Sequence, residues 1–121
     1  MLNALEYAYI GDAVYELYVR KYLISTGITK VSELTKESLK YVSAKSQRRH
    51  LERLINASFL SEEEISLVKY GRNTKGTKSK SSDIVTYRKA TGLECLIGYL
   101  HLKNNEIRVK EIINFIVSEE K

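Results

Sequence analysis

Apolar side chains recur at spacings of three and four residues along most of the chain, which is the period of an amphipathic helix. In the first segment, for example, Ile10, Val14 and Leu17 fall on one helical face. No segment alternates with a period of two for long enough to predict a strand. The predicted helices span about 3–25, 31–57, 61–70, 84–103 and 105–119, and the second has a looser stripe that suggests two pieces. We therefore predict an all-α bundle of five or six helices.

Local signals mark several of the predicted helix ends. Ser61 followed three residues later by Glu64 has the spacing of a capping box, and the acids in that first turn suit the positive end of the helix dipole. Gly27 is expected to end the first helix, and Gly11 to break or kink it. The run GRNTKGTKSKSS at about 71–82 is dense in Gly, Ser, Thr and Lys. It predicts a flexible basic loop inside a single domain that spans 1–121.

The composition narrows the class of protein. A length of 121 residues favours one domain, and an apolar fraction of 43% is enough for a core. Twenty Lys and Arg against 15 Asp and Glu give a net charge of +5, which suits an anionic partner without demonstrating one. One Cys and two His argue against a disulfide framework and a zinc enzyme. Because no apolar run approaches the ~20 residues of a membrane span and no secretory signal is visible, we expect a cytoplasmic protein with no membrane partner.

The length and the first helix favour self-association. A chain of this size, folded alone, buries only about two-thirds of its unfolded surface. Apolar residues lie on more than one face of the first predicted helix, including Tyr15 and Tyr18 around Ala13 and Val14. We therefore expect a homodimer with two-fold symmetry.

Two acids interrupt strongly apolar helical runs: Asp12 in YAYIGDAVY and Glu94 in GLECLIGYLHL. Glu94 has no basic residue three or four positions away, so it is not a simple surface pair, and burying it unpaired would cost several kcal/mol. One interpretation is structural, with Asp12 as a helix N-cap after Gly11 and Glu94 paired with an Arg such as Arg88 or Arg48. The other is a metal or catalytic role. Mg²⁺ suits such acids because it takes oxygen ligands and often binds only one or two carboxylates.

Basic residues gather in two places. A charge run is usually a solvated surface, and contact with phosphates is the alternative interpretation. The second interpretation is favoured at the predicted loop, where the backbone N–H groups of Gly71 and Gly76 lie among the cations. The cluster around the loop contains Lys69, Arg72, Lys75, Lys78, Lys80, Arg88 and Lys89, and the cluster in the second helical region contains Lys40, Lys45, Arg48, Arg49 and Arg53.

Two stretches of the sequence resemble motifs of the ribonuclease III family. YIGDAVYE, at 9–16, resembles the family signature, and TGLECLIG, at 91–98, resembles its second acidic motif. The closer resemblance is to the mini-ribonuclease III branch, and it covers nearly the whole chain. Further segments agree in the right order: YVSAKSQ at 41–47, FLSEEE at 59–64, GRNTK at 71–75 and DIVTYR at 83–88.

The resemblance implies an all-α, ribonuclease III endonuclease-domain-like bundle of five to seven helices that works as a homodimer. Asp12 and Glu94 fall on two of the four acid positions that surround the metals in the family. The other two fall on Ala8 and Thr91, which lack carboxylates, and the mini branch shares these losses. The implied activity is that of a Mg²⁺-dependent endoribonuclease, with Mn²⁺ as a substitute. Its implied task is the cleavage of double-stranded RNA in the maturation of a ribosomal RNA precursor.

We expect basic side chains of the helical domain itself to bind this RNA. Double-stranded RNA is recognised mostly by its shape, its phosphates and its 2′-hydroxyls, a mode that suits a flexible basic loop. A non-catalytic double-stranded-RNA-binding module on the same fold and a basic protein-interaction domain are the alternatives, and the retention of the two acids argues against the first. The expected RNA contacts are Arg72, Asn73, Lys75, Lys78 and Lys80, with Lys45, Arg48 and Arg88 as additional ones.

Overall fold

A computed structural model describes residues 1–74 and 83–119. Within these ranges the chain forms helices only, so the prediction of an all-α bundle is confirmed. The predicted helical region 31–57 divides into two helices that meet at Ser43. None of the helices in the described ranges is long and apolar enough to cross a membrane. The helices are α1 (Ala4–Ser25), α2 (Val31–Val42), α3 (Ala44–Asn56), α4 (Glu62–Arg72), α5 (Ile84–Leu102) and α6 (Glu106–Ser118).

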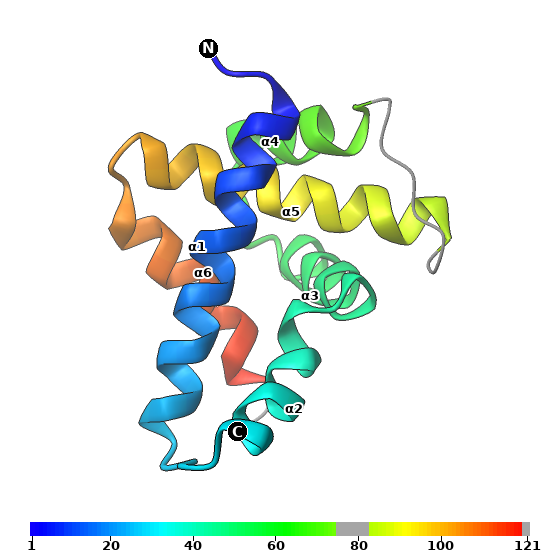
Figure 1. The fold of residues 1–121 in the computed structure, drawn as a ribbon. Coiled ribbons are helices and arrows are strands. Elements are labelled where there is room, and N and C mark those ends of the chain that lie inside the picture. Colours follow the sequence, from blue (N-terminus) through cyan, green and yellow to red (C-terminus); the bar gives the residue numbers. More distant parts are fainter. Residues whose placement is uncertain (75–82, 120–121) are drawn as a thin grey trace.

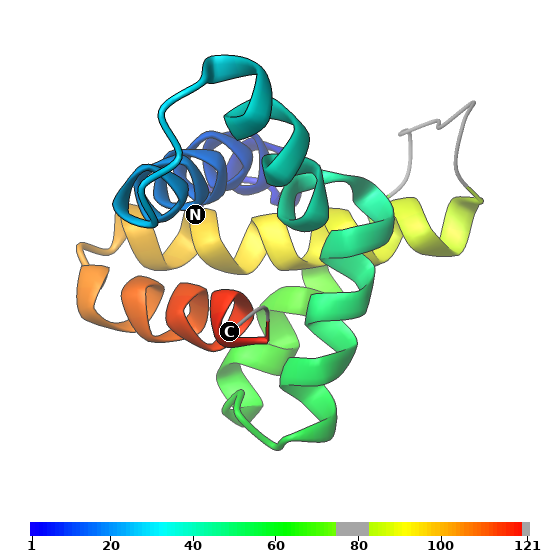
Figure 2. The same cartoon turned by 90° about the horizontal axis from the view of Figure 1, so that it is seen from below.

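Helix α5 lies at the centre of the bundle. It runs between α1 on one side and α4 and α6 on the other, and α3 packs against it as well (Figure 2). Between Ala90 and Gly98 every residue of α5 is buried except Glu94, which is half-buried. A helix that is apolar on every side is typical of such a central position. Glu94 is therefore the one acid that α5 carries into the middle of the protein.

Two glycines allow α1 and α5 to cross in direct backbone contact (Figure 1). A Cβ atom added to Gly11 would lie 1.7 Å from the carbonyl oxygen of Glu94, and one added to Gly98 would lie 1.8 Å from that of Tyr7. Any side chain at either position would force the helices apart. Gly11 therefore sets the distance between the helices, and the expected break is wrong because α1 is one continuous helix from Ala4 to Ser25.

The variant Gly11→Ala is expected to lose about 3 kcal/mol or more of unfolding free energy, the upper end for an overpacked core. The clash is with backbone atoms of α5, which cannot rotate away as a side chain can. Chemical denaturation measures the loss. The control Ala13→Gly changes an exposed site two residues away and should cost only about 1 kcal/mol of helix propensity. A Gly11→Ala protein as stable as this control would show that the crossing is looser.

The helix ends follow the local signals with two differences. Ser61 caps α4 in a capping box with Glu64, and Gly27 ends α1 with a φ of 97°, as predicted. The N-cap of α1 is Asn3, so the interpretation of Asp12 as an N-cap is wrong. Helix α4 continues to Arg72, so the predicted loop cannot begin at 71. The rest of that loop, 75–82, lies outside the described residues.

Candidate active site

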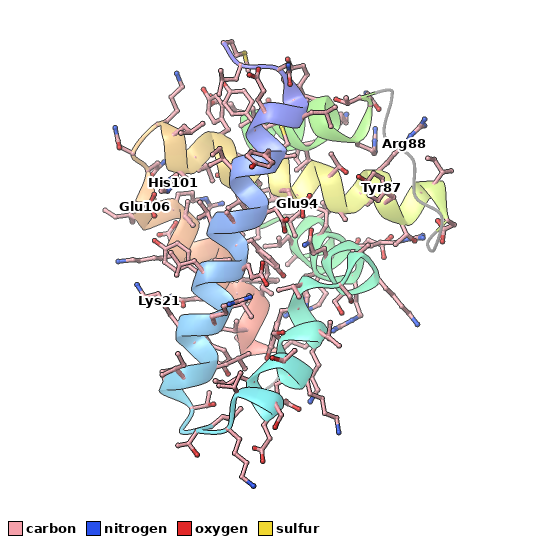
Figure 3. All side chains as sticks on the ribbon, viewed as in Figure 1. Lys21, Tyr87, Arg88, Glu94, His101 and Glu106 are labelled. Atoms are coloured by element: carbon pink, nitrogen blue, oxygen red, sulfur yellow. The ribbon has the colours of Figure 1, made fainter. Side chains whose placement is uncertain are left out.

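The crossing of α1 and α5 brings two acids from distant parts of the chain together. Asp12 follows Gly11 on α1, and the Gly11 backbone lies against the backbone of Glu94 on α5. The two side chains are close enough for a hydrogen bond between their carboxyl groups. Figure 3 shows Glu94 at the point where α5 passes α1. The two acids are 82 positions apart in sequence, and a glycine contact that periodicity cannot reveal brings them together.

The surroundings of Glu94 oppose its ionisation. Burial and then the negative charge of Asp12 raise the pKa of the Glu94 carboxyl to about 8. One neutral donor acts against this rise: the Nε2 of Gln47, on α3, donates to Glu94 Oε2 over 3.3 Å and lowers the pKa. Without a cation, Glu94 therefore keeps its proton near neutral pH.

The expected arginine partner of Glu94 is wrong. Arg48 donates to Glu52 Oε2 over 3.2 Å and to Thr86 Oγ1 over 2.9 Å, and it lies 3.8 Å from Asp83 Oδ1. Arg88 is exposed near the first turns of α5, well away from Glu94 along the helix (Figure 3). Neither of the two expected arginines therefore neutralises Glu94.

The donor atoms at this site fit Mg²⁺. Two carboxylates converge, and carboxylate oxygens with water are the ligands that this ion prefers. The Oε1 atom of Gln47 is buried and has no hydrogen-bond partner in the part of the chain that the structure describes. A divalent cation would also relieve the repulsion that raises the pKa of Glu94. In the same described ranges no group of three or more His, Cys, Asp and Glu gathers, so the acid pair is a sparse ligand set.

Comparison with known proteins assigns the chain to a family. The model of the ribonuclease III domain matches residues 5–105, a range that includes both acids. The chain belongs to the ribonuclease III family. A Mini-ribonuclease 3 of Enterococcus faecalis is 45% identical over 119 residues, which cover 98% of this chain and 90% of that protein. A Mini-ribonuclease 3 of Streptococcus pneumoniae is 41% identical, with 98% and 94% covered.

The three-dimensional comparison agrees. A crystal structure of a Fusobacterium nucleatum protein superposes with a TM-score of 0.86 at 35% identity, and the match covers 98% of this chain and 94% of that one. Together these similarities make the protein an endoribonuclease of the ribonuclease III family and place it with the Mini-ribonuclease 3 proteins. The resemblance to the mini branch is confirmed.

Ala8 and Thr91, which the resemblance implied to stand at the family's other two acid positions, lie on the same helices as Asp12 and Glu94. Ala8 is buried on α1, one turn before Asp12. Thr91 is buried on α5, one turn before Glu94, and its hydroxyl donates to the carbonyl of Tyr87 over 3.0 Å. Neither supplies a carboxylate, and the Thr91 hydroxyl proton is already used within α5.

Part of the predicted RNA-contacting set lies along a basic groove. Lys45 and Arg48 line it with Lys40 and Arg49, at the meeting of α2, α3 and the start of α5. Arg48 contributes less free charge than expected because of its contacts with Glu52 and Asp83. Asn73 and Arg88 are exposed, and Arg72 is half-buried at the end of α4. The remaining predicted contacts, Lys75, Lys78 and Lys80, lie outside the described residues.

Gln47 was not among the residues predicted for the site from sequence. It carries no charge, interrupts no apolar run and lies between two other polar residues, Ser46 and Arg48. The one signal was its place at the end of the segment YVSAKSQ, which resembles the family. Its contact with Glu94 depends on the packing of α3 on α5, which no local pattern contains.

Proposed function

We propose that this protein is a divalent-metal-dependent endonuclease for double-stranded RNA, with Asp12 and Glu94 as the ligands of Mg²⁺ and the catalytic acids. The observation that carries the proposal is the close approach of the two carboxyl groups at the crossing of α1 and α5. Ribonuclease III enzymes generally depend on a divalent metal and act on double-stranded RNA, which supports it.

Each part of the site has a chemical task in this proposal. Bound Mg²⁺, or Mn²⁺ in its place, would supply Lewis acidity that activates a water molecule and offsets charge at the scissile phosphate. Asp12 and Glu94 hold the ion, and both do so as carboxylates, so Glu94 gives up the proton that it keeps in the metal-free protein. Neither Ala8 nor Thr91 adds a carboxylate to these two ligands.

Incubation of long duplex RNA with the protein tests the proposal. Cleavage in Mg²⁺ and none with a chelator is expected. RNA that is bound but stays intact in Mg²⁺ would instead identify a non-catalytic binding module on the same fold. No salt-dependent RNA binding at all would favour a protein-interaction domain.

We further propose that the duplex is bound through phosphate contacts by Arg72, Asn73, Lys75, Lys78, Lys80, Arg88, Lys45 and Arg48. The net charge of +5 and the basic groove beside α3 support this surface. Nucleic-acid binding that neutralises phosphates releases counterions and weakens as salt rises.

Neutralising Lys75, Lys78 and Lys80 together to Gln is expected to weaken duplex binding and to flatten its salt dependence. Each lost phosphate contact should reduce the slope of log K against log salt by roughly one unit, taking duplex DNA as the guide. The control Lys21→Gln and Lys103→Gln removes positive charge from exposed positions outside the proposed surface. An unchanged slope in the triple variant would show that these lysines face only solvent.

We propose that the protein is a homodimer, and the exposed apolar surface at the start of α1 supports it. Tyr9 is 81% exposed, and it lines a shallow groove whose other apolar lining includes Leu2, Leu5, Ile10 and Tyr70. Tyr15, which motivated the expectation from sequence, is instead a core residue whose hydroxyl donates to the carbonyl of Tyr41 over 2.7 Å. The apolar groove replaces it as the reason to expect a partner.

Sedimentation at micromolar concentration is expected to show twice the chain mass of 13.9 kDa. Tyr9→Glu would place a charge in the proposed interface and should yield the monomer. Ile107→Glu is the matched control, because Ile107 is 76% exposed on α6, away from the groove. A wild-type monomer, or equal behaviour of the two variants, contradicts this interface.

We assign the activity to the maturation of a ribosomal RNA precursor, the large-subunit one, in the cytoplasm. The similarity to the Mini-ribonuclease 3 proteins supports an RNA-processing role. Depletion of the protein in its host should then lead to accumulation of precursor rRNA with unprocessed ends. Normal rRNA ends after depletion would assign the enzyme to another RNA.

A further inference from the structure

Gln47 contacts Glu94 of the acid pair and is almost completely buried. It is a residue of α3 and is 2% exposed. Its Nε2 donates to the carbonyl of Val42 over 3.2 Å and to Glu94 Oε2 over 3.3 Å. Its Oε1 is the buried side-chain atom that finds no hydrogen-bond partner among residues 1–74 and 83–119.

The junction between α2 and α3 holds this amide in one orientation. Helix α2 ends at Val42, whose carbonyl accepts from Gln47 Nε2. Ser43 caps α3 by accepting from the backbone N–H of Ser46, and the Ser46 hydroxyl donates to the carbonyl of Leu39 over 3.0 Å. These bonds fix the first turn of α3. Because both groups that face Nε2 are acceptors, a flipped amide would set its oxygen against them.

A polar residue at this position carries a cost in stability. A buried amide oxygen without a partner loses its hydrogen bonds to water, whereas Met or Leu would fill similar space without that loss. This cost is offset if the amide donates a hydrogen bond to a group that has few other donors, and Glu94 is such a group. Tyr15 also lies near Glu94, but its hydroxyl donates to the carbonyl of Tyr41. Asp12 is a second acid, and its negative charge raises the pKa of Glu94 instead of stabilising the carboxylate.

The kind of donor is also informative. An Arg or Lys at position 47 would fix the Glu94 carboxylate but would also neutralise it. A neutral amide fixes one carboxylate oxygen and leaves the negative charge available to a cation. Ligand carboxylates in metal sites are commonly held by hydrogen bonds of this kind.

We propose that Gln47 is a positioning residue of the divalent-metal site: its amide holds the Glu94 carboxylate beside Asp12, so that the two acids bind a cation together. This inference rests on the proposed function, in which Asp12 and Glu94 are the metal ligands. Gln47 itself acts through Glu94 and is not assigned a contact with RNA or with the reacting phosphate.

Binding of Mn²⁺ to the RNA-free protein, followed by electron paramagnetic resonance, tests the inference without an activity assay. Gln47→Met has similar length and no donor, and it is expected to bind Mn²⁺ roughly 10-fold more weakly or worse. Ser38→Ala is the control, because it removes a hydroxyl that donates to the carbonyl of Thr35 within α2 and takes no part in the bonds that hold Gln47 or Glu94, and it should bind like wild type. Equal affinity of Gln47→Met and wild type overturns the inference.

A measurement on the unmodified side chain covers the case in which Gln47→Met does not fold. The side-chain NH₂ resonances of Gln47 in the wild-type protein should shift when Mg²⁺ is added, and the shift should be absent in Glu94→Gln. Resonances that do not respond to Mg²⁺ in the wild type contradict the inference.

RNA cleavage, scored separately, distinguishes this inference from the proposed function. In one outcome, the wild type binds Mn²⁺ tightly, Gln47→Met does not, and the wild type leaves duplex RNA intact. This outcome supports the inference and contradicts the nuclease proposal. In the other outcome, the wild type cuts RNA and Gln47→Met binds Mn²⁺ as well as wild type does. This outcome supports the nuclease proposal and contradicts the inference.

Discussion

Asp12→Asn and Glu94→Gln are each expected to slow cleavage of duplex RNA by at least about 100-fold, the scale of losing one preorganised electrostatic group at a reacting centre. Both substitutions keep the shape of the side chain and remove the charge that binds a cation. RNA affinity and the dimer should remain, because neither acid belongs to the proposed RNA surface or to the exposed groove of α1. Initial cleavage rates in excess Mg²⁺, measured beside RNA binding in a chelator, separate the two effects.

Glu16→Gln is the control for this pair. Glu16 lies one turn after Asp12 on α1 and pairs with Arg20 over 2.9 Å, so it shares the helix but not the site. It should cleave like wild type. Cleavage near the wild-type rate by Asp12→Asn or Glu94→Gln would remove that acid from the site. A loss of about 3–5 kcal/mol of stability in either variant would instead reveal a broken buried ion pair.

The metal-free protein is expected to lose stability as pH rises from about 4.5 to about 8, through the titration of Glu94. The unfolded chain releases this proton near the ordinary value of 4.5, whereas the folded protein holds it until about pH 8. Between these values the folded state binds the extra proton, so raising the pH favours unfolding. The loss is complete above the folded pKa. We expect roughly 2–4 kcal/mol, because solvent reaches part of this half-buried site.

A comparison of wild type with Glu94→Gln isolates this titration from others. His50, which is buried, has a pKa lowered by burial, so it acts in the opposite direction and costs stability as pH falls below 6.5. Denaturation in a chelator should show how much more stable Glu94→Gln is than wild type. This difference in unfolding free energy should grow from about pH 5 to about pH 8 and then level off. Mg²⁺ should reduce that difference most at high pH, where the site is deprotonated. A difference that does not change with pH contradicts the raised pKa of Glu94.

The helices could be predicted from sequence because their signals are local. The spacing of apolar residues and the Ser61–Glu64 capping box depend on neighbours within one or two turns, and both reappear in the structure. Gly11 shows where this reasoning stops. Taken locally, a glycine within a helix suggests a break, yet here it is the contact surface for a second helix more than 80 residues away. Its partner, Gly98, is visible only once α1 and α5 are packed.

In the candidate site, too, local signals could be found from sequence, whereas contacts between helices could not. Asp12 and Glu94 stood out as charges in apolar runs, and the resemblance to the ribonuclease III family paired them. The structural alternatives for both were wrong, because helix capping and ion pairing depend on where α1 begins and where Arg48 points. Gln47 gave no signal of its own, since its importance lies in one hydrogen bond between α3 and α5.

The central claim is that Asp12 and Glu94 together form the divalent-metal site of this endoribonuclease. The most direct test is a Mn²⁺ titration of the RNA-free protein by electron paramagnetic resonance, with wild type beside the double variant Asp12→Asn/Glu94→Gln. We predict saturable binding to the wild type that is lost in the double variant, while both remain folded. The same Mn²⁺ affinity in both proteins would place the metal elsewhere and contradict the account.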